Sequence, residues 1–171
     1  MQALKDRIRR VPDFPKPGIL FYDVTTLLRD PEGFRMAIDA LSNPYRGQGI
    51  SVVVGIESRG FILGGAVADR LGAGFVPVRK LGKLPSTTVR VSYSLEYGSG
   101  SLEMHSDAIE KGQQVLIVDD LLATGGTARA TADLVRQLGG KVHGVAFLIE
   151  LVSLDGRAKL EGENVQAILQ C

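Results

Sequence analysis

The sequence predicts an α/β fold with a central parallel sheet flanked by helices. Short apolar runs rich in β-branched residues, such as SVVVGI at 51–56 and QVLIV at 114–118, alternate with helical patterns. Runs of this kind are typical of strands that are covered on both faces. Strands that alternate with helices imply right-handed crossovers within one parallel sheet. The length of 171 residues, without an internal repeat or a linker, predicts a single domain over 1–171.

The N-terminal part predicts a helix, an extended segment and a second helix. Apolar residues recur at helical spacing from 4 to 11, so the chain is expected to begin with a short amphipathic helix. Three prolines and a glycine between 12 and 18 then favour an extended path. Asp30 is an N-cap followed by proline at the first helical position, and Asn43-Pro44 would end this second helix.

The centre and the C-terminal part predict repeated strand, loop and helix units. We expect strands at 51–56, 75–78, 114–118 and 142–149, with one helix ending near 71–72 and another at about 127–138. The stretch 80–112 departs from this rhythm, because it holds a polar loop, an alternating segment and the turn sequence YGSG. We interpret it as a hairpin with a mobile loop, inserted between units of the sheet.

The composition excludes several classes of function. Hydrophobic residues make up 44% and charged residues 23%, which is typical of a globular protein. A net charge of +1 gives no electrostatic case for binding nucleic acid or a membrane surface, and no apolar run is long enough to cross a bilayer. The single cysteine, Cys171, cannot form an internal disulfide, which favours a reducing compartment. We therefore expect a soluble, cytoplasmic protein.

The strongest functional signal is the segment VLIVDDLLATGGT at 115–127. An apolar strand delivers Asp119 and Asp120 to its C-terminal end, where ligands of open α/β sheets bind. The following Thr-Gly-Gly-Thr turn opens a helix, whose N-terminus offers free N–H groups and a partial positive charge. These features predict a phosphate cradle beside two carboxylates that can accept hydrogen bonds from sugar hydroxyls.

Two other phosphate motifs do not fit, and one simpler interpretation stays open. A Walker A loop requires a lysine after its glycine, whereas Gly126 precedes Thr127, and the three spaced glycines of the dinucleotide fingerprint are missing from this loop. The simpler interpretation is that the two aspartates are solvated and that 124–127 only cap a helix. Capping requires neither paired acids nor tandem glycines, so we favour the phosphate site.

This segment resembles the phosphoribosyl pyrophosphate motif of the type I phosphoribosyltransferases. The resemblance implies that Asp119 and Asp120 bind the ribose hydroxyls, either directly or through Mg²⁺. It also implies that backbone and hydroxyl groups of the following loop bind the 5′-phosphate; these residues are Ala123, Thr124, Gly125, Gly126 and Thr127.

Other blocks resemble the adenine-specific members of that family over nearly the whole chain. They are PDFPKPGILFYD, GIESRGF, RKLGKLP, YSLEYG and LIELVSLDGRAKL. Relatives that act on 6-oxopurines carry an aspartate where this chain has Ala123, and that aspartate handles a proton of the purine. The resemblance implies that Glu96 manages this proton instead. It further implies Mg²⁺ as cofactor, adenine and phosphoribosyl pyrophosphate as substrates, and a homodimer.

The resemblance also assigns the remaining site residues. A small hood at about 12–28 would cover the purine, with Leu20, Tyr22 and Arg59 contacting adenine. Some relatives have arginine at the position of Tyr22, so this chain departs from the pattern there. The basic residues expected to bind pyrophosphate are Arg59, Arg79, Lys80 and Lys83.

Simpler interpretations and two rival functions remain beside these assignments. The basic residues of the loop and Glu96 could face solvent, and His105 and His143 have no companions at metal-ligand spacing. One rival function is the same reaction on another base. The other is a regulator that binds phosphoribosyl pyrophosphate without catalysis, which would be expected to carry a DNA-binding extension or a basic face.

Overall fold

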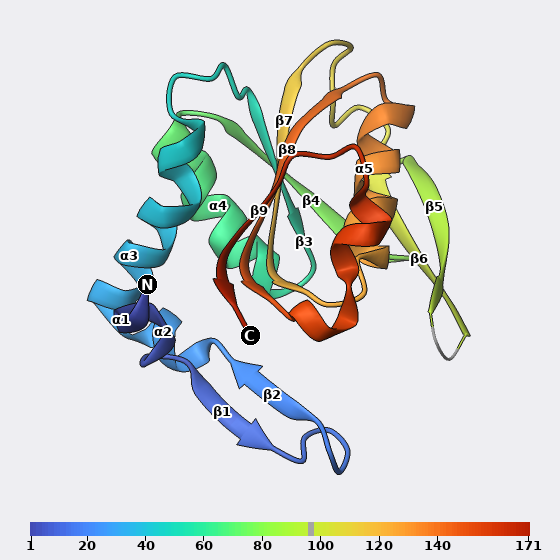
Figure 1. Cartoon of the computed structure of the whole chain (residues 1–171). Helices are drawn as coiled ribbons and strands as arrows, with labels where there is room; N and C mark the ends of the chain where they lie inside the picture. Colours follow the sequence, from blue (N-terminus) through green and yellow to red (C-terminus); the bar gives the residue numbers. More distant parts are fainter. Residues whose placement is uncertain (96–97) are drawn as a thin grey trace.

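The computed structural model describes residues 1–95 and 98–171 and contains a twisted seven-stranded sheet (Figure 1). Its strand order is β5-β6-β4-β3-β7-β8-β9. Five strands are parallel: β3 (Val52–Ile56), β4 (Gly74–Lys80), β7 (Gln114–Leu122), β8 (Lys141–Glu150) and β9 (Val165–Gln170). The predicted parallel sheet is therefore confirmed, and β9 is an edge strand that the sequence analysis did not identify.

The hairpin predicted within 80–112 extends this sheet at its other edge. Strands β5 (Thr88–Leu95) and β6 (Gly98–His105) are antiparallel to each other, and β6 is antiparallel to β4. The pairing with β4 includes Arg79 opposite Glu103. The sheet is thus mixed, and the hairpin continues it as an arm beyond β4.

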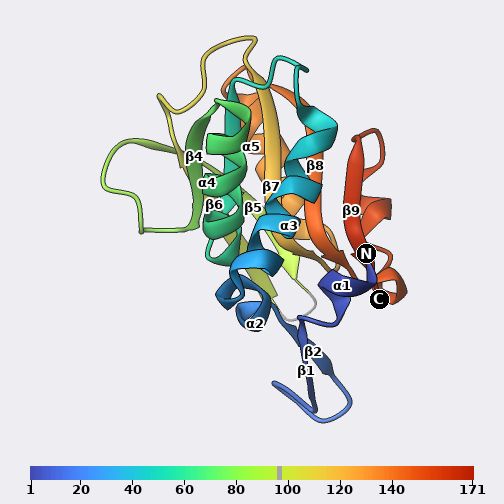
Figure 2. The ribbon, with the colours of Figure 1, turned by 90° about the vertical axis from the view of Figure 1, so that its left-hand side faces the viewer.

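Helices cover both faces of the sheet (Figures 1 and 2). Helices α3 (Pro31–Ser42) and α4 (Arg59–Leu71) pack on one face. Helix α5 (Gly126–Gln137) and the 3₁₀ segment η3 (Gly156–Leu160) pack on the other. Short 3₁₀ turns, η1 (Asn43–Tyr45) and η2 (Val152–Leu154), follow α3 and β8.

The strands contribute alternate residues to two cores. In β3, Val53 packs with the α3 and α4 side, whereas Val52 and Val54 pack with the α5 side. This alternation follows from the period of two along a strand. Because both faces are covered, β3 is buried along its whole length, as its unbroken apolar run predicts.

The N-terminal segment differs from its prediction. Helix α1 (Gln2–Lys5) is short, and Val11 lies in strand β1 (Arg9–Pro12) rather than in a helix. Strand β1 pairs with β2 (Leu20–Asp23) as a separate two-stranded sheet that projects from the body, followed by α2 (Thr25–Arg29) (Figure 1). The prediction that a short helix opens the chain is confirmed, but its continuation to Val11 was wrong, because cross-strand pairing with β2 overrides the helical spacing there.

The predicted helix and strand boundaries in the body are close to those observed. Asp30 caps α3, since its carboxylate accepts a hydrogen bond of 3.1 Å from the Glu32 N–H. Helix α4 ends at Leu71, and Gly72, its C-cap, has a left-handed φ of 67°. Strand β7 runs four residues beyond the predicted end and includes both aspartates. No helix in the described part of the chain is long and apolar enough to cross a membrane.

Candidate active site

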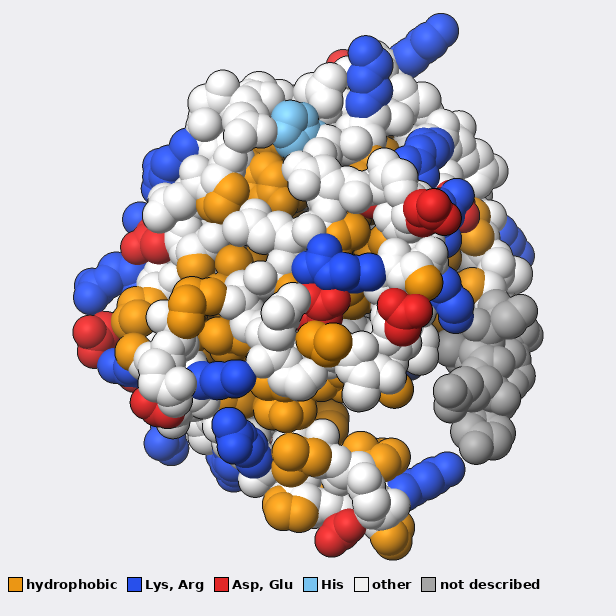
Figure 3. All heavy atoms as spheres, in the orientation of Figure 1, with side chains coloured by type: hydrophobic (Ala, Val, Ile, Leu, Met, Phe, Trp, Pro, Cys, Tyr) orange, Lys and Arg blue, Asp and Glu red, His pale blue; other side chains and the backbone are white. Residues whose placement is uncertain are grey.

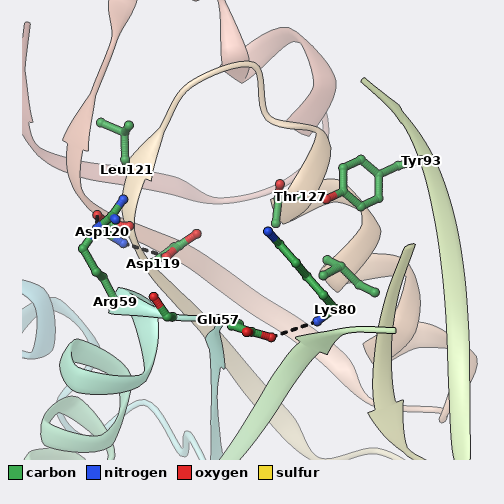
Figure 4. Close-up of a pocket in the computed structure, with 10 residues that line it drawn as sticks. Glu57, Arg59, Lys80, Tyr93, Asp119, Asp120, Leu121 and Thr127 are labelled. Carbon is green, nitrogen blue, oxygen red and sulfur yellow. Dashed lines mark hydrogen bonds and ion pairs between the residues drawn. The ribbon is translucent and has the colours of Figure 1, made fainter. Parts of the chain in front are cut away.

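A polar cleft of about 340 Å³ lies at the carboxyl ends of β3, β4 and β7, where ligands of open α/β sheets bind (Figure 4). The ends of these strands, the start of α5 and the β5–β6 arm all contribute side chains. The lining residues are Glu57, Ser58, Arg59, Lys80, Tyr93, Leu102, Asp119, Asp120, Leu121 and Thr127.

The two adjacent aspartates differ in their surroundings. Asp120 is buried and forms an ion pair with Arg59, the first residue of α4. Asp119 accepts a hydrogen bond of 2.9 Å from the backbone N–H of Asp120. Burial and the neighbouring charge of Asp120 raise the pKa of the Asp119 carboxyl above its usual range. Gly60 permits this packing, because a Cβ there would lie 2.7 Å from Asp119 Oδ1.

The glycine-rich loop after β7 packs backbone against backbone. Gly125 has a φ of 78°, and a Cβ on it would lie 2.3 Å from the carbonyl oxygen of Gly156. A Cβ on Gly156 would lie 2.2 Å from the carbonyl oxygen of Ala123. Two glycines therefore let the C-terminal segment support the loop and set the start of α5. Thr127 from this helix lines the cleft, and the helix N-terminus suits an anion.

Glu57, which lines the cleft, contacts three of the basic residues: Arg79, Lys80 and Lys83. Its Oε2 lies 3.3 Å from Arg79 Nε and accepts a 3.0 Å hydrogen bond from the Lys80 N–H, while its Oε1 forms an ion pair with Lys83. Burial alone would raise the pKa of Glu57, but these hydrogen bonds outweigh it and lower the pKa to about 2. Of the four residues predicted to bind pyrophosphate, Arg59 and Lys80 line the cleft, whereas Arg79 and Lys83 contact Glu57.

Sequence reasoning did not single out Glu57, although a signal for it exists. Glu57 follows the buried strand β3 at its carboxyl end, and Asp119 and Asp120 follow the buried apolar run of β7 in the same way. The polar residues that end neighbouring parallel strands meet at one edge of the sheet. Glu103, on β6, is a second missed acid: it is buried and accepts hydrogen bonds of 3.0 and 3.1 Å from the backbone of Lys83 and Leu84.

A second cavity, of about 380 Å³, lies beneath the N-terminal hairpin and is more apolar. In Figure 3 hydrophobic side chains gather where this hairpin meets the body. Phe14 and Phe21 pack edge to face with centroids 5.2 Å apart, and Arg59 Cζ lies 5.9 Å from the Phe21 ring centroid. The lining residues are Val11, Phe14, Phe21, Asp23, Val24, Thr25 and Arg59. Arg59 thus lines both cavities.

The hood residues named from the sequence lie elsewhere. Side chains alternate along β2, so Phe21 and Asp23 line the second cavity while Leu20 and Tyr22 project to the other side. Leu20 is exposed, and Tyr22 packs against the core, where burial raises the pKa of its hydroxyl. Their contact with adenine stays a prediction. Glu96, the proposed proton carrier, lies outside the described residues.

Comparisons with known proteins show the family to which this chain belongs. Residues 23–165 match the family described as phosphoribosyl transferase domain. Adenine phosphoribosyltransferases of Acidobacterium capsulatum and Solibacter usitatus are 61% and 60% identical, covering 98% and 99% of this chain and 93% and 98% of their own lengths. The adenine phosphoribosyltransferase structure from Rhodothermus marinus has a TM-score of 0.95 at 58% identity, covering 99% of this chain and 97% of its own.

A Saccharomyces cerevisiae adenine phosphoribosyltransferase, solved with an imino-altritol bisphosphate and adenine, has a TM-score of 0.93 at 44% identity, covering 98% of this chain and 97% of its own. The fold and the cleft define the class of phosphoribosyltransferases. Within that class, this chain belongs to the adenine phosphoribosyltransferase family.

Proposed function

We propose that this protein is a purine-salvage enzyme that joins adenine to the sugar of phosphoribosyl pyrophosphate, giving AMP and diphosphate. The observation that carries the proposal is the pair of cavities that share Arg59. The polar cleft suits a sugar phosphate, and the apolar cavity suits a flat purine. The names of the relatives, and the adenine in the yeast structure, support the same base.

In the polar cleft we assign the sugar and its 5′-phosphate to β7 and α5. The carboxylates of Asp119 and Asp120 would accept hydrogen bonds from the ribose hydroxyls. The loop 123–127 and the first turn of α5 would bind the 5′-phosphate through backbone N–H groups and the Thr127 hydroxyl. These contacts hold C1 of the sugar at the boundary between the two cavities.

We assign the pyrophosphate to Arg59, Lys80 and the residues that Glu57 holds. Arg79 and Lys83 are already gathered around Glu57, so a strongly anionic group entering the cleft would compete with this carboxylate for them. Stabilising the charge that develops on the leaving group is commonly the largest contribution to catalysis of this kind. The loop that carries these residues would also exclude water, which competes with the base for C1.

The cleft residues fit a magnesium ion that arrives with the substrate. Mg²⁺ commonly binds through one or two carboxylates together with phosphate oxygens and water. Asp119 and Asp120 supply this number of carboxylates, and residues 1–95 and 98–171 contain no cluster of three potential ligands. When bound, the ion would neutralise charge on the departing pyrophosphate.

In the apolar cavity we assign the purine to Phe21 and Arg59. The ring of adenine would stack on Phe21, while N9 attacks C1 of the sugar. The bond from C1 to the pyrophosphate oxygen breaks, and its electron pair leaves with pyrophosphate. N9 loses its proton as the new bond forms. Ala123 cannot accept this proton, so we propose that the carboxylate of Glu96 accepts it.

The test is AMP formation from adenine and phosphoribosyl pyrophosphate with Mg²⁺, with hypoxanthine, guanine and xanthine measured in parallel. We expect turnover with adenine only. Turnover with another purine alone would retain the sugar site and overturn the assigned base. Binding of phosphoribosyl pyrophosphate without turnover of any base would instead favour a regulator.

We also propose a cytoplasmic homodimer. The family resemblance supports the dimer, and large apolar side chains are exposed at Ile62 on α4, at Phe75 near the start of β4 and at Leu81 directly after β4. Sedimentation at micromolar concentration should give the mass of a dimer. A fully active monomer would refute the dimer and leave the reaction unaffected.

A further inference from the structure

Tyr93 lines the sugar-phosphate cleft across from the start of α5, and none of the assignments above uses it. It belongs to β5, on the arm that extends the sheet beyond β4. Its side chain lines the polar cleft and also a neighbouring cavity of about 200 Å³, which Gly126 and Arg129 of α5 line as well. The ring therefore forms a wall that faces the first turn of α5 from the opposite side of the cleft.

Gly100, the cross-strand partner of Tyr93, sets the direction of this ring. The two residues are paired in the β5–β6 register. A Cβ on Gly100 would lie 2.7 Å from Tyr93 Cζ and 2.8 Å from its hydroxyl oxygen. The ring thus lies across the glycine backbone, and any side chain at position 100 would displace the hydroxyl. An aromatic ring that covers a strand glycine is held more tightly than a free surface side chain.

The Tyr93 hydroxyl points into the cleft toward Thr127 (Figure 4). A phenol hydroxyl can donate one hydrogen bond. The start of α5 presents backbone N–H groups to the same space and favours an anion there. A phosphate on this helix would receive backbone donors from one side and the Tyr93 hydroxyl from the other.

We propose that the Tyr93 hydroxyl donates a hydrogen bond to the 5′-phosphate of the phosphoribosyl substrate and helps the protein select phosphorylated sugars. This inference rests on the proposed function, because it takes the 5′-phosphate to lie at the start of α5. Tyr93 is then a binding residue, and Gly100 is the positioning residue that directs it.

The direct test compares Tyr93→Phe with the wild type. Phenylalanine retains the ring and its packing on Gly100 and removes only the hydroxyl. A hydrogen bond to a charged group is worth enough that its loss should weaken binding about 10- to 100-fold. We expect the KM for phosphoribosyl pyrophosphate to rise by this factor while the KM for adenine stays unchanged. Calorimetry should show the same loss for ribose 5-phosphate.

Two further variants separate this role from a structural one. Gly100→Ala leaves the Tyr93 hydroxyl present but displaces it, so it should also weaken ribose 5-phosphate binding. Tyr45→Phe is the matched control, since the buried Tyr45 hydroxyl has no hydrogen-bond partner in the described structure and lies outside the cleft lining. This control should bind ribose 5-phosphate like the wild type.

The outcomes distinguish this inference from the proposed function. If the wild type binds ribose 5-phosphate and Tyr93→Phe binds it equally well, the role of Tyr93 is refuted and the reaction is not. If the wild type binds neither ribose 5-phosphate nor phosphoribosyl pyrophosphate, the proposed function fails and the inference fails with it. If Tyr93→Phe binds ribose 5-phosphate more weakly while Tyr45→Phe binds it like the wild type, the result supports both the role of Tyr93 and the proposed function.

Discussion

The two cavities that meet at Arg59 are built in different ways. The polar cleft is formed by the ends of buried parallel strands, and its charged groups are held by one another: Asp120 pairs with Arg59, and Glu57 with Lys83. The apolar cavity is formed by a separate two-stranded sheet that projects from the body and contributes aromatic side chains such as Phe21. The charged groups lie at the ends of the parallel strands and in the segments that directly follow them, whereas the aromatic side chains lie on an added hairpin.

This difference implies that the cavities can be altered separately. Changes in the β7–α5 loop should affect the sugar phosphate alone, and changes in the hairpin should affect the base alone. Glu96 should affect neither KM, because its assigned role is in the chemical step.

The largest effect is expected at Glu96. Glu96→Ala should lower kcat about 10²- to 10⁴-fold, because positioned acid–base groups contribute rate enhancements of that size. Both KM values should change little. Steady-state kinetics with each substrate varied in turn provides the measurement, and an unchanged kcat would remove Glu96 from the mechanism.

The next effect is expected in the loop after β7. Gly125→Ala would force a left-handed backbone of φ 78° on alanine and place its Cβ 2.3 Å from the Gly156 carbonyl. Such strain costs about 1–3 kcal/mol, so we expect the KM for phosphoribosyl pyrophosphate to rise roughly tenfold or more with that for adenine unchanged.

Gly139→Ala is the matched control for this loop. Gly139 has a similar φ of 87°, but its added Cβ would make only ordinary contacts, the nearest being 3.4 Å from Lys111. It should lower the unfolding free energy and leave both KM values unchanged. Equal KM changes in the two variants would show that general strain, and not the phosphate loop, is responsible.

A smaller effect is expected in the apolar cavity. Stacking of a base on an aromatic side chain is worth about 1–3 kcal/mol, so Phe21→Ala should raise the KM for adenine roughly tenfold and spare that for phosphoribosyl pyrophosphate. Leu20→Ala should raise it less, because Leu20 projects away from the cavity. The opposite order would favour the sequence-based assignment of Leu20 over that of Phe21.

The last predicted effect concerns stability and not substrate binding: a pH dependence of unfolding at Glu57. Its pKa is lowered from 4.5 to about 2, so its ion pairs contribute fully above pH 4.5 and are lost as the pH falls toward 2. In urea unfolding, the wild type should have a higher free energy of unfolding than Glu57→Gln. This difference should stay constant down to about pH 5 and become smaller below it. Glu161→Gln, on the exposed surface, is the control. A difference that widens in acid would contradict the ion-pair account.

The same contrast explains what could be predicted from the sequence. The strand before Asp119, the glycine loop and α5 form one continuous segment, so local patterns were enough to place the β7–α5 unit. The residues of the hood that line the apolar cavity were harder to predict, because they depend on which face of β2 turns toward the body. Hydrophobic alternation in a short exposed hairpin does not settle that choice, and Phe21 was missed.

Long-range contacts were also out of reach of local patterns. Nothing near Gly125 in the sequence indicates that Gly156 packs on it. The edge strand β9, which follows Gly156 in the chain, was not predicted either. Likewise, the contacts of Glu57 with Lys83 join residues from separate elements. Periodicity and turn chemistry predicted the elements, whereas the contacts between them required the fold.

The most direct test of the account is whether the two cavities form one site, and AMP is the ligand that would span both. We would titrate AMP by calorimetry into the protein alone, and into protein saturated separately with adenine and with ribose 5-phosphate. The account predicts that each fragment weakens AMP binding, because AMP occupies both cavities that Arg59 lines. AMP binding that is unaffected by adenine would show that the apolar cavity is not the base site and would contradict the account.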